Sequence, residues 1–219
     1  MNIEALPVAP VILSAASVGG LVLADQMQFR PGRYLCKPLA ALAFLWLALA
    51  LGAMDSSYGR WLLVGLLLCM LGDLLLMPED ERCFLAGLVA FLCGHLLYAV
   101  AFLQLGASPI GPVVSALPCL LLLVLTYRWI LPRVDPPMKG PVACYMWVIT
   151  GMLLCASLTL RHPASLLIIA GAWGFALSDL AVARQQFIKA SPRNGLWGTP
   201  LYFFSQMVLA ASLAMVQPG

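Results

Sequence analysis

Long apolar segments separated by short polar ones account for almost the whole chain. Eight apolar segments can be counted, at residues 8–24, 38–53, 61–77, 84–104, 112–130, 141–160, 164–182 and 199–216. About 20 apolar residues, at a rise of ~1.5 Å each, cross the ~30 Å hydrocarbon core of a bilayer as a helix. The pattern therefore predicts an all-α protein, a polytopic transmembrane bundle of eight helices.

The composition excludes a soluble fold. Of all residues, 63% are hydrophobic and 10% are charged, whereas roughly a quarter of the residues in soluble domains are charged. The polar segments are too short to form a separate soluble domain, so we expect residues 1–219 to be a single transmembrane domain surrounded by membrane lipids. The net charge is +3, and the chain has no basic run with interleaved aromatic residues. We therefore expect no nucleic-acid partner.

Basic residues gather on one side of the expected bundle. The segments that follow the first, third, fifth and seventh apolar stretches hold Arg30, Arg33, Lys37, Arg82, Arg128, Arg133, Lys139, Arg184, Lys189 and Arg193. The opposite side holds Arg60 and Arg161. Because loops rich in Lys and Arg remain in the cytoplasm, we expect both termini on the non-cytoplasmic side of a plasma membrane, the inner membrane if the chain is bacterial.

Two aspartates stand alone in otherwise apolar segments. Asp73 is the only charge in residues 61–77, and Asp179 is the only charge in residues 164–182. A carboxylate at the centre of a membrane helix costs about 2.5–3.5 kcal/mol on the insertion scale, and such residues face a bundle interior or a wet cavity. With Met77 and Arg184 taken as the cytoplasmic helix ends, both aspartates are expected ~6–8 Å inside, at one depth. This shared depth makes them a candidate catalytic pair.

Other polar side chains are expected within reach of the two aspartates. His95 and Tyr98 are three residues apart, Tyr202 and Gln206 are four apart, and each pair therefore shares one helix face. Lys37 lies at the cytoplasmic end of the second apolar stretch. Each also has a purely structural interpretation: a histidine bonded to a carbonyl or to Tyr98, a membrane-anchoring lysine, and polar contacts between helices. As functional residues, they are candidates for substrate binding.

Several kinds of catalytic site are excluded by their missing motifs. The chain has no GxSxG, HExxH or Walker sequence. Its two histidines, His95 and His162, lie far apart, and its seven cysteines form no CxxC pair. We therefore expect no metal site. If the protein is an enzyme, its working groups are carboxylates assisted by His or Tyr.

Five short motifs resemble one known family. They are Tyr34-Leu35-Cys36-Lys37-Pro38, GDLLLM at 72–77, GHLLY at 94–98, SDLAVA at 178–183 and PLYFFSQ at 200–206. In this order, and together with eight expected spans, they resemble the YhhN-like lysoplasmalogenases over nearly the whole chain.

The resemblance implies an integral membrane hydrolase that cleaves the vinyl ether bond of lysoplasmalogens, lysophospholipids within the bilayer. The products would be a fatty aldehyde and glycerophosphoethanolamine or glycerophosphocholine. The family is thought to use two intramembrane aspartates without a cofactor, and these match Asp73 and Asp179. Our hypothesis is that Asp179 is the general acid and Asp73 the base or the stabiliser of the cation. Lys37 would bind the phosphate, and the hydrocarbon chain would run past His95 and Tyr98.

A proton-coupled transporter of a small or amphipathic solute is the alternative from a different class of protein. Paired intramembrane carboxylates also serve as proton relays, and eight helices suit a carrier. The two halves of the chain do not show matching helices interrupted by Gly or Pro, which many carriers contain. Product formation distinguishes the two, because a carrier leaves lysoplasmalogen intact.

Overall fold

The computed structural model describes residues 7–78 and 80–216, and within them the chain forms eight α-helices, two short 3₁₀ helices and no strand. The α-helices are α1 (Val8–Gln26), α2 (Arg30–Ala50), α3 (Ser57–Leu75), α4 (Glu81–Leu103), α5 (Ile110–Ile130), α6 (Pro136–Leu158), α7 (Ser165–Phe187) and α8 (Pro192–Ala211). The 3₁₀ helices are η2 (Leu131–Arg133) and η3 (Ser212–Met215). The all-α prediction with eight helices is confirmed for these residues.

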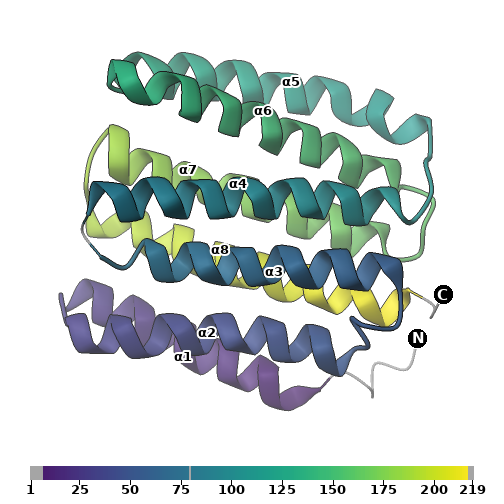
Figure 1. The fold of residues 1–219 in the computed structure, drawn as a ribbon, viewed down its shortest axis with the longest axis horizontal. Helices are drawn as coiled ribbons and strands as arrows, with labels where there is room; N and C mark the ends of the chain where they lie inside the picture. The colour runs from purple at the N-terminus through teal and green to yellow at the C-terminus, as the bar shows by residue number, and fades with distance from the viewer. Residues whose placement is uncertain (1–6, 79, 217–219) are drawn as a thin grey trace.

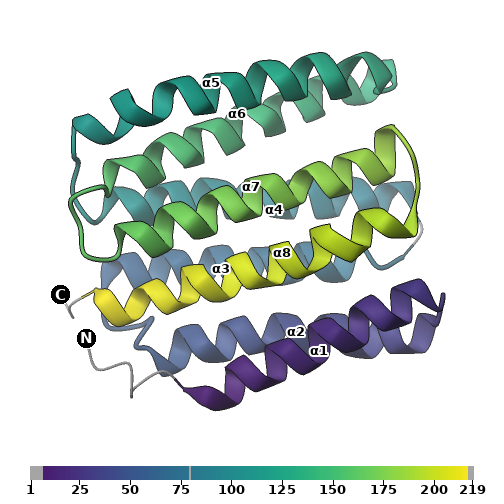
Figure 2. The same ribbon diagram turned by 180° about the vertical axis from the view of Figure 1, so that it is seen from behind.

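Consecutive helices pack side by side as antiparallel pairs. The pairs are α1–α2, α3–α4, α5–α6 and α7–α8 (Figure 1). The α3–α4 and α7–α8 pairs lie in the middle of the bundle, with α1–α2 along one side and α5–α6 along the other (Figures 1 and 2). Helix α1 begins and α8 ends at the same end of the bundle. This arrangement agrees with the expected topology, in which both termini are on one side of the membrane. Which side that is stays a prediction.

Close backbone approaches hold the two central pairs together. A Cβ atom on Gly65 of α3 would lie 2.5 Å from the Tyr98 ring of α4, and one on Gly174 of α7 would lie 2.2 Å from Ser205 Oγ of α8. Small residues allow such contacts between membrane helices, where dispersion forces replace the hydrophobic effect. These contacts hold α3, which carries Asp73, against α4, and α7, which carries Asp179, against α8.

Two segments expected as polar loops are largely helical. Residues 26–37 were expected to be a loop before the second span, but α2 begins at Arg30 with a proline in its first turn. Residues 184–198 were expected to be a loop as well, but α7 continues to Phe187, and α8 begins at Pro192, where Ser191 Oγ accepts the amide of Arg193 at 3.3 Å. The length of an apolar run underestimates the length of these helices, because each has polar residues in its terminal turns.

Seven helices, α1 to α7, are long and apolar enough to cross a membrane, judged by length and composition of the described residues. The chain is thus an integral membrane protein. Helix α8 is not among the seven, because its first turns carry Arg193 and Asn194 and its middle carries Gln206. It also ends at Ala211, before the expected boundary at residue 216. Helix α8 packs against α1, α2 and α7. Asn194 and Gln206 are buried, whereas Arg193 is exposed.

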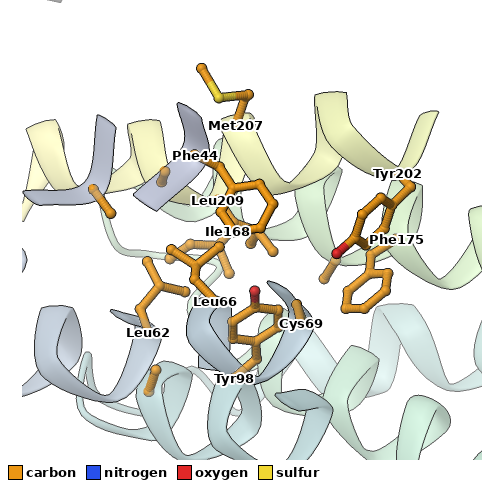
Figure 3. Packing of buried hydrophobic residues seen from close by; sticks show 14 of the residues in the cluster. Phe44, Leu62, Leu66, Cys69, Tyr98, Ile168, Phe175, Tyr202, Met207 and Leu209 are labelled. Carbon is orange, nitrogen blue, oxygen red and sulfur yellow. The ribbon is translucent and has the colours of Figure 1, made fainter. Parts of the chain in front are cut away.

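The hydrophobic core divides into two clusters. The larger draws side chains from all eight helices, and Figure 3 shows its centre, where Tyr98, Phe175 and Tyr202 lie among aliphatic residues. The smaller cluster consists of Leu123, Ile130, Val134, Val142 and Met146 and lies between α5 and α6. Leu180 and Phe187 of α7 also pack on this cluster, and α6 packs on α4 and α7, so the α5–α6 pair is joined to the bundle mainly through α6.

Candidate active site

Asp73 is a buried carboxylate with a partner on each oxygen. It lies near the end of α3 and is 2% exposed. Lys37 Nζ of α2 lies 3.3 Å from its Oδ1, and the Tyr202 hydroxyl of α8 donates to its Oδ2 at 2.7 Å. A cation and a hydroxyl donor both stabilise an ionised carboxylate. Three helices thus converge on Asp73.

Asp179 has a different set of partners, none of which is a Lys or Arg within the described part of the chain. The Tyr145 hydroxyl of α6 donates to its Oδ2 at 3.0 Å. His95 Nε2 of α4 lies 3.4 Å from the same oxygen, without the geometry of a hydrogen bond. Helices α4, α6 and α7 therefore converge on Asp179, whose side chain is 14% exposed.

The orientation of His95 is fixed by its surroundings. Its ring is fully buried and stacks on Phe175 at a centroid distance of 4.2 Å. Its Nδ1 lies 2.8 Å from the carbonyl oxygen of Phe91. A carbonyl oxygen only accepts, so Nδ1 carries the hydrogen, and in the neutral imidazole Nε2 is left with a lone pair. That lone pair is on the side of the ring that faces Asp179.

Tyr98 and Gln206 form a separate buried contact. The Tyr98 hydroxyl donates to Gln206 Oε1 at 2.7 Å, and both side chains are fully buried. Gln206 Nε2 has no hydrogen-bond partner among the described residues. The contact joins α4 to α8 in the core.

One large cavity connects the two aspartates. It has a volume of about 1140 Å³, and Asp73, Asp179, Lys37, Tyr145 and Tyr202 all line it. Ligand cavities are commonly ~300–1,000 Å³, so this one is large enough for a lipid. Two buried carboxylates with different partners, both reachable from one cavity, form a candidate active site.

The sequence-predicted residues divide into two groups around this cavity. Lys37, Asp73, Asp179 and Tyr202 line it. His95, Tyr98 and Gln206 are buried and are not among its lining residues. The hydrocarbon path expected past His95 and Tyr98 therefore has no counterpart in the cavity of the described chain, and His95 reaches the site through Asp179.

The two aspartates do not lie at the equal distances from their helix ends that were expected. Asp73 lies two residues before Leu75, where α3 ends, whereas Asp179 lies eight residues before Phe187, where α7 ends. The difference arises because α7 continues as a helix beyond Arg184. Their common cavity comes from helix packing and not from matching distances to the helix ends.

Tyr145, which lines the cavity and donates to Asp179, is a candidate site residue that was not predicted from the sequence. It was overlooked because no polar neighbour at helical spacing accompanies it in the apolar stretch 141–160. A signal was present nonetheless, because a tyrosine hydroxyl inside a membrane segment needs a hydrogen-bond partner. Within the described residues there is no cluster of three or more His, Cys, Asp or Glu that could hold a metal ion. The expectation of no cofactor stays a prediction.

Several named proteins are similar to this chain over most of its length. Lysoplasmalogenase TMEM86B of Rattus norvegicus is 36% identical over 202 residues, which cover 89% of this chain and 77% of the rat protein. Lysoplasmalogenase TMEM86B of Mus musculus is 33% identical, with coverage of 96% and 87%. Lysoplasmalogenase TMEM86B of Homo sapiens is 31% identical, with coverage of 86% and 77%. No solved structure matches the chain.

The family assignment covers the whole site. The sequence model of the YhhN family matches residues 32–213, a range that includes both aspartates, Lys37, Tyr145 and Tyr202. This match extends over well more than half of the chain and agrees with the resemblance carried by the five short motifs. The protein belongs to the YhhN family.

Proposed function

We propose that this protein hydrolyses the vinyl ether bond of lysoplasmalogens, with Asp179 as general acid and Asp73 as general base. Family membership and the relatives named lysoplasmalogenase support the substrate class. The observation that carries the mechanism is that one cavity reaches both buried aspartates, of which Asp73 is paired with a cation and Asp179, among the described residues, is not. Hydrolysis of an enol ether can use both forms of a carboxyl group, an acid that protonates the β-carbon and a carboxylate that stabilises the cation and accepts a proton from water.

The partners of the two aspartates support this division of roles. Asp73 faces the Lys37 ammonium and a hydroxyl donor, which favour its ionised form. Asp179 has no Lys or Arg partner among the described residues, and the neutral imidazole of His95, whose Nε2 lies 3.4 Å from Asp179 Oδ2, brings no positive charge to it. Burial without a cation favours the neutral form of a carboxyl group. In this proposal Asp179 therefore holds the acidic proton beside the cavity.

The reaction then follows with all protons accounted for. Asp179 gives its proton to the β-carbon of the vinyl ether, and an oxocarbenium ion forms. Water adds to the cationic carbon and loses one proton to Asp73, giving a hemiacetal. The hemiacetal hydroxyl returns its proton to Asp179, the bond to the glycerol oxygen breaks, and that oxygen takes the proton held by Asp73. Glycosidases divide two carboxyl groups around a similar cation.

Lys37 and Arg33 are the proposed contacts of the lipid phosphate. Both line the cavity near the beginning of α2. Lys37 has three donors and contacts Asp73 through Nζ, so it can bind phosphate and carboxylate together. Arg33 Nε lies 2.8 Å from Asp25 Oδ1, which holds the guanidinium at the mouth. The headgroup would remain at this polar end while the ether reaches the aspartates.

The experiment is an aldehyde assay with purified protein, with a chelator present. The substrates are 1-alkenyl-lysophosphoethanolamine and its 1-acyl counterpart, which has the same headgroup but no vinyl ether. We expect fatty aldehyde from the alkenyl lipid only. If folded protein releases no aldehyde, and instead carries a solute or proton across sealed vesicles, the hydrolase proposal is wrong and the transporter alternative replaces it.

A further inference from the structure

The two ends of the cavity differ in chemical character. Charged side chains, among them Asp25, Arg33, Asp80 and Asp135, line it at the end of the bundle where α2, α4 and α6 begin. Apolar side chains of α5 and α6 line it further in. The cavity is therefore amphipathic along its length, as a single-chain lipid is.

The apolar, inner part of the cavity extends further from the charged end than Tyr145 and the Asp179 carboxyl do. Helix α6 begins at Pro136, and Tyr145, which bonds Asp179, is nine residues further on, or ~14 Å along the axis. Thr150 also lines the cavity, five residues beyond Tyr145, or ~7–8 Å deeper. Space for a ligand thus extends past the Asp179 carboxyl towards the middle of the bundle.

The threonine hydroxyls that line the cavity on α5 and α6 have no free donor. Thr150 Oγ1, in the inner part, donates to the Met146 carbonyl at 2.8 Å, and Thr126 Oγ1, near the end of α5 and so closer to the charged end, donates to the Leu122 carbonyl at 2.7 Å. Both hydroxyls are satisfied within their own helices. The remaining surface there, which includes Leu123 and Ile149, is apolar and suits a hydrocarbon chain.

The position of the inner part between the two hydrophobic clusters explains why space exists there. Leu123, Val142 and Met146 belong to the small cluster of α5 and α6, whereas Ile149 and Phe203 belong to the large one, and all five line the cavity. Helix α5 touches α7 in only a small area. The inner part of the cavity lies where α5 and α7 have little contact, beside α6.

We propose that the hydrocarbon chain of the lipid substrate lies in this inner part, between α5, α6 and α7, and that Ile149 and Thr150 determine the chain length that the site accepts. The inference rests on the proposed function, since it places the vinyl ether at the aspartates and the rest of the chain beyond them. It replaces the path past His95 and Tyr98, which the cavity does not follow.

The first test compares two substrates that share a headgroup, 1-octenyl- and 1-hexadecenyl-lysophosphoethanolamine. A single methylene in an apolar pocket changes kcat/KM by ~10–200-fold, so Ile149→Trp should lower kcat/KM for the hexadecenyl lipid at least ~10-fold relative to the octenyl lipid. Ile149→Ala should shift the ratio towards the long chain. Cys144→Trp, at an exposed position of α6, is the matched control and should leave the ratio unchanged.

Two results would overturn the proposal while leaving the hydrolase intact: an unchanged ratio in both Ile149 variants, or the same shift in Cys144→Trp.

A second test measures lipid binding through thermal stability and does not need catalysis. Saturated 1-O-alkyl lysolipids have no vinyl ether, and the hexadecyl form should raise the Tm of the wild type more than the octyl form does. Ile149→Trp should abolish that difference, while Ile149→Ala retains it. Loss of aldehyde release with this pattern preserved would contradict the proposed function alone.

Discussion

Each of the two aspartates accepts a tyrosine hydroxyl on its Oδ2, but among the described residues only Asp73 has a cation on its other oxygen. This difference at the scale of single residues distinguishes an ionised carboxylate from a neutral acid in the proposed mechanism. The two tyrosine hydroxyls should therefore contribute differently to activity, because a hydrogen bond to a charged group is stronger than one to a neutral group.

Removing each tyrosine hydroxyl measures that difference. Tyr202→Phe removes a donor from ionised Asp73, where such a bond is worth ~1.5–3 kcal/mol, so kcat/KM should fall by ~10–100-fold. Tyr145→Phe removes a donor from neutral Asp179, worth ~0.5–1.5 kcal/mol, so the decrease should be ~2–10-fold. Steady-state aldehyde release is the measurement. A larger loss in Tyr145→Phe would reverse the assignment of acid and base.

Lys37 has two proposed partners, Asp73 and the lipid phosphate, and kinetics can separate them. If its main task is to keep Asp73 ionised, Lys37→Met should lower kcat by ~100-fold or more, within the ~10²–10⁴-fold range of general acid–base catalysis. Lys37→Arg should recover part of kcat. The control is Lys139→Met, a basic residue of α6 that does not line the cavity. A change in KM with an unaltered kcat would show that Lys37 only binds substrate.

At this scale the charged residues of the candidate site could be identified from the sequence, but the side chains that contact them could not. Asp73, Asp179 and Lys37 were predictable because a lone charge in an apolar helix is costly and needs a partner. Tyr145 was not identified, and His95 was expected to touch substrate although it is fully buried behind Asp179. Which side chains face one another depends on helix rotation, and apolar spans that are hydrophobic on all sides carry little information about rotation.

At the scale of helices, the α5–α6 pair forms one wall of the cavity and depends on a close backbone contact. A Cβ on Gly111 of α5 would lie 1.8 Å from the carbonyl oxygen of Ser157 in α6. A backbone atom cannot move aside as the end of a flexible side chain can. The two helices can therefore approach this closely only because residue 111 is a glycine.

Gly111→Ala should consequently separate the helices and destabilise the protein by about 1–3 kcal/mol, as overpacking does. The matched control is Gly151→Ala in α6, where an added Cβ meets nothing within 4 Å. This control should be neutral or stabilising by up to ~1 kcal/mol, the difference in helix propensity. Thermal unfolding in detergent measures both. Equal stability of the two variants would show that the Gly111 contact does not hold the pair together.

The helix count was predictable, but several helix ends were not. Hydropathy marks the part of a helix that is apolar, and α2, α7 and α8 all extend into segments with Arg, Gln or Asn. Capping signals at Pro31 and Ser191 were present in the sequence and would have corrected two of these ends. The pairing of α3 with α4 and α7 with α8 follows from sequence adjacency, while the packing of α4 on α6 does not.

At the scale of the whole molecule, the charged end of the cavity lies on the side where the basic loops gather. The expected topology puts this side in the cytoplasm, so lipid headgroups would enter from the cytoplasmic leaflet. Lys139 at the start of α6 and Arg161 between α6 and α7 mark the two opposite ends of the bundle, and both are exposed.

Labelling of variants with one added cysteine tests this topology in intact cells. Arg161→Cys should react with an impermeant maleimide added outside, whereas Lys139→Cys should react only after the membrane is permeabilised, because basic loops remain in the cytoplasm. The wild type, with its own seven cysteines, gives the background. The opposite labelling pattern would place the mouth of the cavity on the outer side.

The most direct test of the account is aldehyde release from 1-alkenyl-lysophosphoethanolamine by the wild type, Asp73→Asn, Asp179→Asn and Asp55→Asn side by side. Asp55 lies in the loop between α2 and α3 and is exposed, so its variant controls for the loss of a carboxylate elsewhere. We expect both site variants to lose at least ~10²-fold in kcat, the scale of general acid–base catalysis, and Asp55→Asn to match the wild type. Near-normal aldehyde release by either folded site variant would contradict catalysis by the paired aspartates.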